Sequence, residues 1–244
     1  MRDVQKFTSE LTRVFKLNGL SSLLSAEKSE KLLRLTDRML EENEKYNLTA
    51  ITDPDKIILN HYADSATLAM RLPKGSTVID VGCGAGFPSL PLAILREDLK
   101  ILAVDSTAKR VTYVAETAEL LGISNLECRV MRAEDGGKDP SLRESFDFAT
   151  ARAVAELRTL CELCLPFVKL GGELIAMKGK NGEFELKSAA KAISVLGGKG
   201  GKLEAVTLKG GDESIEHCFI SVKKVNKTPG SYPRPFAQIS KKPL

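Results

Sequence analysis

The chain of 244 residues has no tryptophan, five cysteines and no apolar run of about 18 residues or more. We therefore predict no membrane-spanning helix, and the polar stretch 1–10 is unlike a secretory signal. The odd number of cysteines, without a tight framework, favours reduced thiols over a disulfide scaffold. We expect a cytoplasmic protein, whose 43% of hydrophobic residues is enough for a folded core.

The positive charge is concentrated at one end. The formal net charge is +4, but the stretch 222–244 contains six basic residues and no acidic one, which leaves residues 1–221 with a charge of −2. A basic segment of this kind favours a polyanionic partner. The alternative is a solvated tail that aids solubility.

The first third of the sequence has the pattern of helices. Apolar residues recur at three- and four-residue steps over 4–15, and Asn18-Gly19 is a helix stop. A second helix is expected over 26–44, with Ser25 as its cap. We predict a helical cap over residues 1–73 and a second unit over 74–244.

From residue 74 onwards, short strands alternate with helices. This order predicts an α/β fold with a mostly parallel, Rossmann-like sheet, whose strand carboxyl ends share one ligand-binding edge. Strands over 203–208 and 218–222 suit a closing antiparallel pair, and 197–201 suits a flexible connector or surface loop. The other strands are expected over 77–81, 100–104, 126–130, 146–150 and 173–177, with helices over 88–95, 108–121 and 156–165.

A glycine-rich loop follows the first strand. Gly82, Gly84 and Gly86 permit a tight turn that leaves no Cβ in the way of a ligand. Asp105 ends the second strand, where its carboxylate can accept hydrogen bonds from both ribose hydroxyls; the alternative is a helix N-cap. Residues 132–134 follow the third strand and can meet an adenine edge. The spacing G-x-G-x-G, rather than G-x-G-x-x-G, favours an adenosyl ligand smaller than NAD.

The loop Asp80-Val-Gly-Cys-Gly-Ala-Gly-Phe87 resembles the cofactor loop of class I S-adenosylmethionine-dependent methyltransferases. From about residue 30 to 244, ordered segments resemble one branch, the RsmG (GidB) family of bacterial small-subunit ribosomal RNA guanine-N7 methyltransferases. The sequence departs from the pattern of this family at two places. Thr150 stands where many relatives have serine, and the tryptophan that often precedes Asn43 is missing. The segments are Asn43 with Tyr46-Asn-Leu-Thr-Ala-Ile51, His61-Tyr-Ala-Asp-Ser65, Ala151-Arg-Ala-Val154, Met177-Lys-Gly179, Tyr232-Pro-Arg234 and Lys242-Pro-Leu244.

The resemblance implies S-adenosyl-L-methionine as the cofactor and small-subunit ribosomal RNA, or the ribosomal subunit, as the substrate. We expect a monomer, because no dimerisation stripe is evident, and no metal site. The expected cofactor contacts are Gly82, Gly84, Gly86, Phe87, Asp105, Ser106, Thr107, Ala133, Glu134 and Arg152. The expected RNA contacts are Lys178, Lys223, Lys224, Arg234, Lys241 and Lys242.

Transfer of a methyl group to guanine N7 places modest demands on a protein. N7 has a free lone pair, so no base has to remove a proton before it attacks, and alignment is the main requirement. We therefore assign no catalytic residue and name Arg152, His61 and Lys178 as candidates. The alternative roles are a structural ion pair for Arg152, a surface position for His61 and an exposed position for Lys178.

Two other functions stay open at this point. The chain is alternatively a class I methyltransferase for another RNA, a protein or a small molecule, or an RNA-binding module with an inactive pocket. Cys161-Glu-Leu-Cys164 has the C-x-x-C spacing of a zinc or redox site, but it lies in a helical segment without a second ligand pair. His217-Cys218 is a poor complement, because adjacent strand residues point to opposite faces. We interpret these cysteines as small buried apolar side chains.

Overall fold

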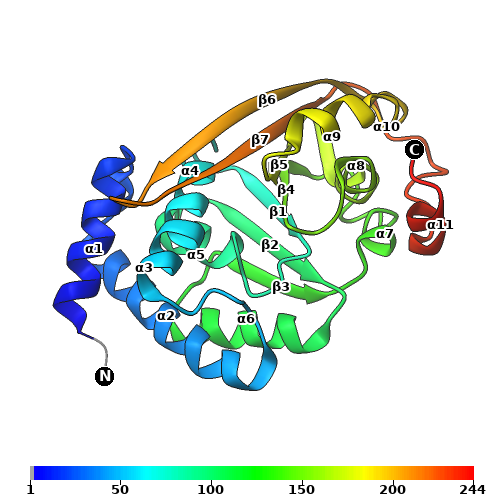
Figure 1. Ribbon diagram of the computed structural model, residues 1–244. Helices are drawn as coiled ribbons and strands as arrows, with labels where there is room; N and C mark the ends of the chain where they lie inside the picture. Colours follow the sequence, from blue (N-terminus) through cyan, green and yellow to red (C-terminus); the bar gives the residue numbers. More distant parts are fainter. Residues whose placement is uncertain (1–2) are drawn as a thin grey trace.

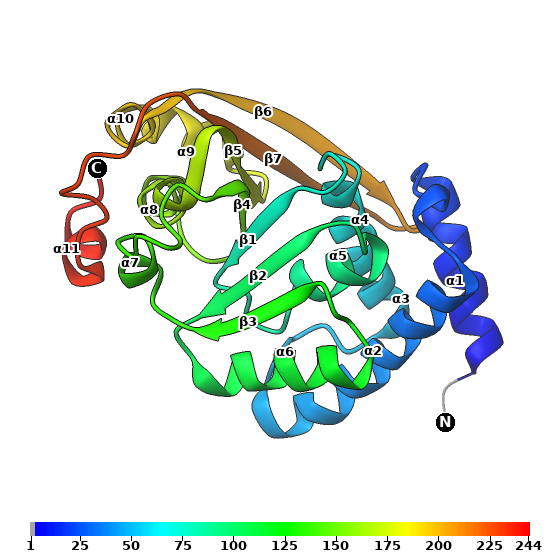
Figure 2. The same cartoon turned by 180° about the vertical axis from the view of Figure 1, so that it is seen from behind.

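A computed structural model describes residues 3–244, which form one seven-stranded sheet with helices on both faces (Figures 1 and 2). The strand order is β3-β2-β1-β4-β5-β7-β6, and in the described part of the chain only β7 runs opposite to the other strands. The strands are β1 (Thr77–Val81), β2 (Lys100–Asp105), β3 (Leu126–Val130), β4 (Phe146–Arg152), β5 (Val168–Lys178), β6 (Gly198–Lys209) and β7 (Ser214–Lys224).

Helices precede the sheet and alternate with its strands. The described helices are α1 (Val4–Leu17), α2 (Ala26–Tyr46), α3 (Pro54–Ile57), α4 (Asp64–Ala69), α5 (Ser89–Leu95), α6 (Ala108–Leu120), α7 (Ala133–Gly136), α8 (Leu157–Cys164), α9 (Gly182–Ser188), α10 (Ala190–Val195) and α11 (Phe236–Lys241), with a π-helix at Ile58–Ala63 and 3-10 turns at Ser21–Leu23 and Leu165–Phe167. No helix between residues 3 and 244 combines the length and the apolar character needed to cross a bilayer.

The predicted α/β class and the mostly parallel sheet with its closing antiparallel pair are confirmed. The prediction of a loop over 197–201 is wrong, because Gly198 and Lys199 already pair with β7. Between Lys199 and Lys202 the register shifts, so that Gly200 and Gly201 lie opposite a single residue of β7. This is a β-bulge, and Gly200 has the positive φ of 58° that favours glycine there.

The N-terminal helices share one apolar core with the sheet. Ser25 caps α2 by accepting a hydrogen bond from Lys28 N, and Asn18 ends α1, as the sequence predicts. Buried side chains of α1 and α2, such as Phe15 and Leu35, belong to the same core cluster as Phe219 of β7. The boundary at residue 73 is therefore not a break in the apolar core, and it stays a prediction.

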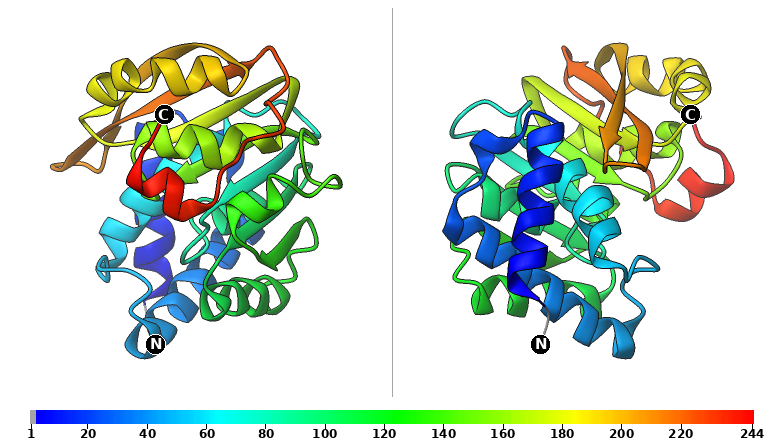
Figure 3. Two further views of the ribbon diagram at one scale, coloured as in Figure 1. Left: turned by 90° about the vertical axis from the view of Figure 1, so that its right-hand side faces the viewer. Right: turned by 60° about the vertical axis from the view of Figure 1, so that its left-hand side comes forward.

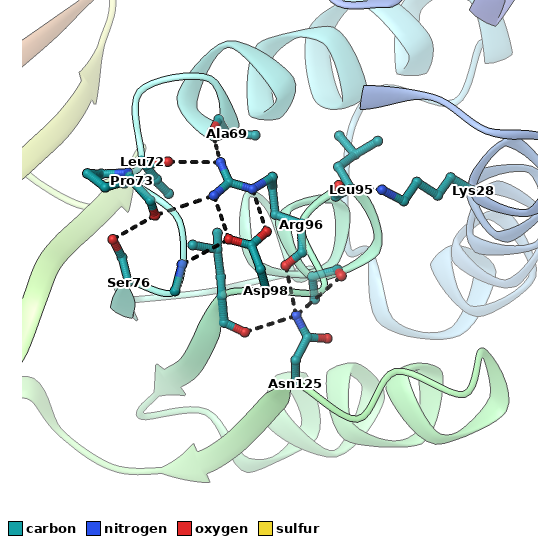
Figure 4. Close-up of polar contacts among 12 residues, drawn as sticks. Lys28, Ala69, Leu72, Pro73, Ser76, Leu95, Arg96, Asp98 and Asn125 are labelled. Carbon is teal, nitrogen blue, oxygen red and sulfur yellow. Dashed lines mark hydrogen bonds and ion pairs between the residues drawn. The ribbon is translucent and has the colours of Figure 1, made fainter. Parts of the chain in front are cut away.

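Polar contacts tie the loop before β1 to the sheet (Figure 4). The Arg96 guanidinium donates to the carbonyl oxygens of Ala69 and Leu72 and forms an ion pair with Asp98, at 2.7, 2.9 and 2.7 Å respectively. Lys28 of α2 donates to the carbonyl oxygen of Leu95 at 2.8 Å. Because the guanidinium satisfies carbonyl groups that would otherwise be orphaned, it fixes the entry of the chain into β1.

Residues 225–244, which we call the docked segment, lie against the body of the protein (Figure 3). Arg143 clamps the start of the segment by donating to the carbonyl oxygens of Thr228 and Tyr232 at 2.7 and 2.9 Å. α11 packs against α8, where Ile239 is fully buried. The segment is therefore part of the fold, and the alternative of a solvated tail is wrong.

Two of the expected RNA contacts have other roles in this structure. The Lys224 ammonium is buried, donates to Leu165 O at 2.7 Å and contacts Thr228 Oγ1, and burial lowers its pKa to about 8. Arg234 forms an ion pair with the fully buried carboxylate of Glu162, with 2.6 Å between Nη2 and Oε2. The expectation of an RNA contact is corrected for Lys224, because its charge does not reach the surface. An RNA contact of Arg234, whose side chain is 21% exposed, stays a prediction and requires the guanidinium to exchange Glu162 for a phosphate. Lys223 of β7 and Lys241 and Lys242 of the docked segment are exposed and stay predictions.

Candidate active site

The glycine loop after β1 is held against β2. The amides of Gly82 and Cys83 both donate to Val104 O, at 2.8 and 3.0 Å. Gly86 has a φ of 84°, and a Cβ at this position would lie 2.4 Å from the Leu90 side chain. Because Leu90 is buried in the core, the turn requires glycine at position 86.

Asp105 connects this loop to the start of α6. One carboxylate oxygen accepts a hydrogen bond from Gly84 N at 3.1 Å, and the other accepts one from Thr107 N at 2.8 Å. Asp105 is nevertheless not the N-cap of α6, because Thr107 holds that position and the carboxylate accepts from the amide of Thr107 itself. Each oxygen keeps further acceptor capacity, so the ribose role is compatible with these contacts and stays a prediction.

A cavity of about 290 Å³ opens at the carboxyl ends of β1, β2 and β3, and we call it the first cavity. Among its lining residues are Phe236 of the docked segment, Leu163 of α8 and Met131, none of which the sequence suggested. Gly84, Gly86, Phe87 and Arg152 do not line it. Of the expected cofactor contacts, the residues that line it are Gly82, Asp105, Ser106, Thr107, Ala133 and Glu134.

Asp80 is a fully buried carboxylate at the end of β1, next to the glycine loop. Burial raises its pKa to about 6, and the nearby Ser89 opposes this shift. Neither carboxylate oxygen has a hydrogen bond of acceptable geometry from residues 3–244. A buried acceptor without a donor is costly, so this position fits a ligand that brings N–H groups or positive charge.

A second cavity of about 290 Å³ adjoins the first, and Ala153 lines both. Ala153 has a φ of 56°, a left-handed conformation that non-glycine residues adopt rarely and that is frequent at functional sites. The lining residues of the second cavity are Asn60, Asp64, Arg152, Ala153, Met177, Lys178, Gly179, Ile215, Glu216 and His217.

Arg152 is the centre of a polar cluster beside the second cavity. Its guanidinium donates to Asn60 O at 2.9 Å, to Asp64 Oδ2 at 3.1 Å and to His61 Nδ1 at 3.0 Å. It also lies 5.4 Å from the centroid of the Phe87 ring, close enough for a cation–π contact. The structural ion pair that the sequence left open for Arg152 is therefore present, with Asp64 as its partner.

His61 is buried, so the alternative of a surface histidine is wrong. Its ring stacks on Phe87 with 4.3 Å between the centroids. Nδ1 lies 3.0 Å from Arg152 Nη2, which can only donate, and 3.2 Å from Asn60 O, which can only accept, while Nε2 lies 3.4 Å from Thr49 Oγ1. Burial, followed by the charge of Arg152, lowers the pKa of His61 to about 3, so the ring is neutral near pH 7.

Lys178 ends β5 at the rim of the second cavity. Its ammonium donates to Ala155 O and forms an ion pair with Glu185, both at 2.8 Å. Only 11% of its side chain is exposed, so the alternative of an exposed lysine is wrong. A phosphate contact stays a prediction, and such a contact requires the ammonium to exchange Glu185 for the phosphate.

Long-range folding brings together residues that sequence reasoning did not connect. His217 of β7 lies with Nε2 3.2 Å from Asp64 Oδ1, although 153 positions separate the two residues. The C-x-x-C cysteines 161 and 164 lie in the apolar core, where burial raises the pKa of Cys161 to about 12. The sequence offers a signal for Asp64 as a site residue, because it lies within the family-like segment His61–Ser65. No sequence pattern indicates that His217 or Phe236 lies at the site.

Comparisons with known proteins identify the family of the chain. Residues 28–215 match the family model GidB, described as rRNA small subunit methyltransferase G. A ribosomal RNA small subunit methyltransferase G of Clostridium beijerinckii is 45% identical over 91% of this chain and 92% of its own length. The protein of the same name from Lactobacillus acidophilus is 46% identical over 84% and 87%.

Solved structures with low sequence identity share the fold. A SAM-dependent O-methyltransferase of Thermotoga maritima matches with a TM-score of 0.53 and 16% identity over 78% of this chain and 72% of its own. The precorrin-6y C5,15-methyltransferase of Geobacter metallireducens matches with a TM-score of 0.52 and 14% identity over 73% and 91%. With the fold, the glycine loop and the near full-length relatives in agreement, the chain belongs to the GidB family, described as rRNA small subunit methyltransferase G.

Proposed function

We propose that the chain transfers the methyl group of S-adenosyl-L-methionine to N7 of a guanine in small-subunit ribosomal RNA. The observation that carries this proposal is the match of the family model over residues 28–215 and of a relative over 91% of the chain. The guanine N7 position follows from the resemblance of the ordered motifs. The first cavity, lined by the loop residue Gly82 and by Asp105, supports an adenosyl cofactor.

Several side chains suit the parts of the cofactor. Asp105 would accept hydrogen bonds from the ribose hydroxyls, and Ala133 and Glu134 would meet the adenine. The buried carboxylate of Asp80 would bind the ammonium of the methionine moiety, because burial disfavours its charge and Ser89 opposes this effect only in part. When bound, the cofactor supplies an electrophilic methyl group on a sulfonium. Arg152, which lines the second cavity, and Ala153, which lines both cavities, would align the acceptor base with it.

Mapping of N7-methylguanine on small-subunit ribosomal RNA tests this function. We expect a strain without the gene to lose the modification at one guanine and to regain it when the wild-type gene is restored. A gene that encodes Asp105→Ala serves as the matched control and should restore much less. An unchanged methylation map in the deletion strain would contradict the substrate. In that case, calorimetry with S-adenosylmethionine separates another methyltransferase, which binds it, from an RNA-binding module, which does not.

Phe236 provides a separate prediction about the first cavity. Its side chain is half exposed and lines the cavity from the docked segment. A bound adenine would cover the ring, so Phe236→Ala should raise the cofactor Kd by about tenfold, as expected for loss of one aromatic contact. Phe184→Ala is the control, because Phe184 is 76% exposed and does not line the cavity. Equal Kd values for the two variants in calorimetry would exclude a role for Phe236.

A further inference from the structure

The second cavity contains a buried acceptor with unused capacity. Asp64 is 7% exposed and lines this cavity. Its Oδ2 accepts from Arg152, but Oδ1 has no hydrogen bond of acceptable geometry from residues 3–244, although His217 Nε2 lies 3.2 Å away. Burial lowers the pKa of His217, so its ring does not supply a permanent positive charge. The carboxylate thus fits a ligand that brings N–H donors into this cavity.

Guanine has the matching chemistry. Its Watson–Crick edge carries the N1–H and the N2 amino group as adjacent donors, whereas adenine has no N1–H donor. Enzymes that modify a base read its Watson–Crick edge in a pocket after extrusion from the stack. In such a pose the opposite edge of the ring, with N7, is left free to face the first cavity across Ala153.

We propose that Asp64 is a catalytic residue that accepts hydrogen bonds from N1–H and the N2 amino group of the target guanine. This inference rests on the proposed function, because it takes guanine as the methyl acceptor. The N7 lone pair forms the new N–C bond as the C–S bond breaks, and the sulfonium becomes a neutral thioether. The base gains the positive charge and no proton leaves it, so a carboxylate on its N–H edge is bound more strongly in the transition state.

Other groups around the second cavity are less suited to this role. The Glu216 side chain is 62% exposed and lies 3.7 Å from Lys180, so water weakens its interaction with a base. Asn60 O already accepts from Arg152. Lys178 and Arg152 are donors, which suit guanine O6 and phosphate but not the N1–H edge. Asp64 is therefore the lining group that is both buried and able to accept.

An enzyme variant combined with a substrate variant tests the contact. Two small-subunit ribosomal RNAs are assembled by ligation, one with guanosine and one with inosine, which lacks the N2 amino group, at the mapped position. The wild type should prefer guanosine in kcat/KM by about ten- to a hundredfold, as expected for one hydrogen bond to a charged group. Asp64→Ala should methylate both RNAs within about twofold of each other. Glu216→Gln should keep the wild-type ratio.

Controls separate this contact from effects on folding and on the proposed function. Calorimetry with S-adenosylmethionine shows whether Asp64→Ala and the isosteric Asp64→Asn retain the first cavity. Where turnover is too slow, the Kd values of the two RNAs with S-adenosylhomocysteine present give the same comparison. If both Asp64 variants keep the full preference for guanosine over inosine, the inference is overturned. It is also overturned if this preference is lost in Glu216→Gln but kept in the Asp64 variants. If the wild type binds the cofactor but methylates neither RNA, the proposed function fails instead.

Discussion

Arg234→Ala is expected to lower the free energy of unfolding by about 3–5 kcal/mol, because it leaves a charge buried without its partner. The Glu162 carboxylate on α8 is fully buried. Arg234 donates to it from its backbone amide at 2.9 Å and from its guanidinium at 2.9 and 2.6 Å. Loss of the side chain removes two of these three donors. Urea unfolding followed by circular dichroism measures the change.

Arg158→Ala is the matched control for this prediction, since Arg158 lies on α8, the helix that carries Glu162. Its ion pair with Glu156 is long, at 3.5 Å, and 71% of the Glu156 side chain is exposed. Solvent screens such a pair, so the control should change stability by less than about 1 kcal/mol. The double variant Arg234→Met with Glu162→Gln should recover part of the loss, because it removes the buried charge. Equal stability of Arg234→Ala and Arg158→Ala would contradict the assignment.

The second large effect concerns the cofactor. Asp105→Ala should raise the Kd for S-adenosylhomocysteine by about a hundredfold, since charged hydrogen bonds to two hydroxyls are lost and Gly84 N and Thr107 N lose their acceptor. Calorimetry measures this Kd. Asp135→Ala is the control, because Asp135 is exposed on α7 and does not line the first cavity. Its Kd should stay within about twofold of the wild type.

A modified ligand separates the ribose contact from the loop contacts of Asp105. Removal of both ribose hydroxyls should weaken binding to the wild type but cost nothing further in Asp105→Ala. If the dideoxy ligand loses the same affinity in both proteins, Asp105 only fixes the glycine loop to α6. The ribose assignment would then be wrong, while the proposed reaction would be unaffected.

Local patterns were enough to predict the part of the site that lies on consecutive strands. A β-branched run predicts β1, and the glycines after it predict a tight turn that only glycine allows. Asp105 is predicted as a site residue because it is an acid at the end of the next strand. Parallel strands place their carboxyl ends on one edge, so the meeting of Gly82, Asp105 and Glu134 in one cavity follows from topology.

The remaining part depends on contacts between distant segments, which composition does not encode. Lys224 and Arg234 look like surface charges in sequence, but buried acceptors from other elements, such as Leu165 O and Glu162, engage them. The approach of His217 to Asp64 depends on β7 adding antiparallel to β5 beside the π-helix. The spacing of apolar residues in the sequence does not distinguish a π-helix from an α-helix, because one extra residue in a single turn changes that spacing too little.

The bulge in β6 also bears on self-association. β6 is an edge of the sheet in the described chain, and an open edge offers backbone N–H and C=O groups to any strand of another molecule. Here the two glycines at 200 and 201 interrupt the register, and Lys199, Lys202 and Lys209 are exposed along the strand. An incoming strand would meet a kinked backbone and exposed lysines that resist burial. The same device that ends the sheet at seven strands thus protects the protein from edge-to-edge aggregation.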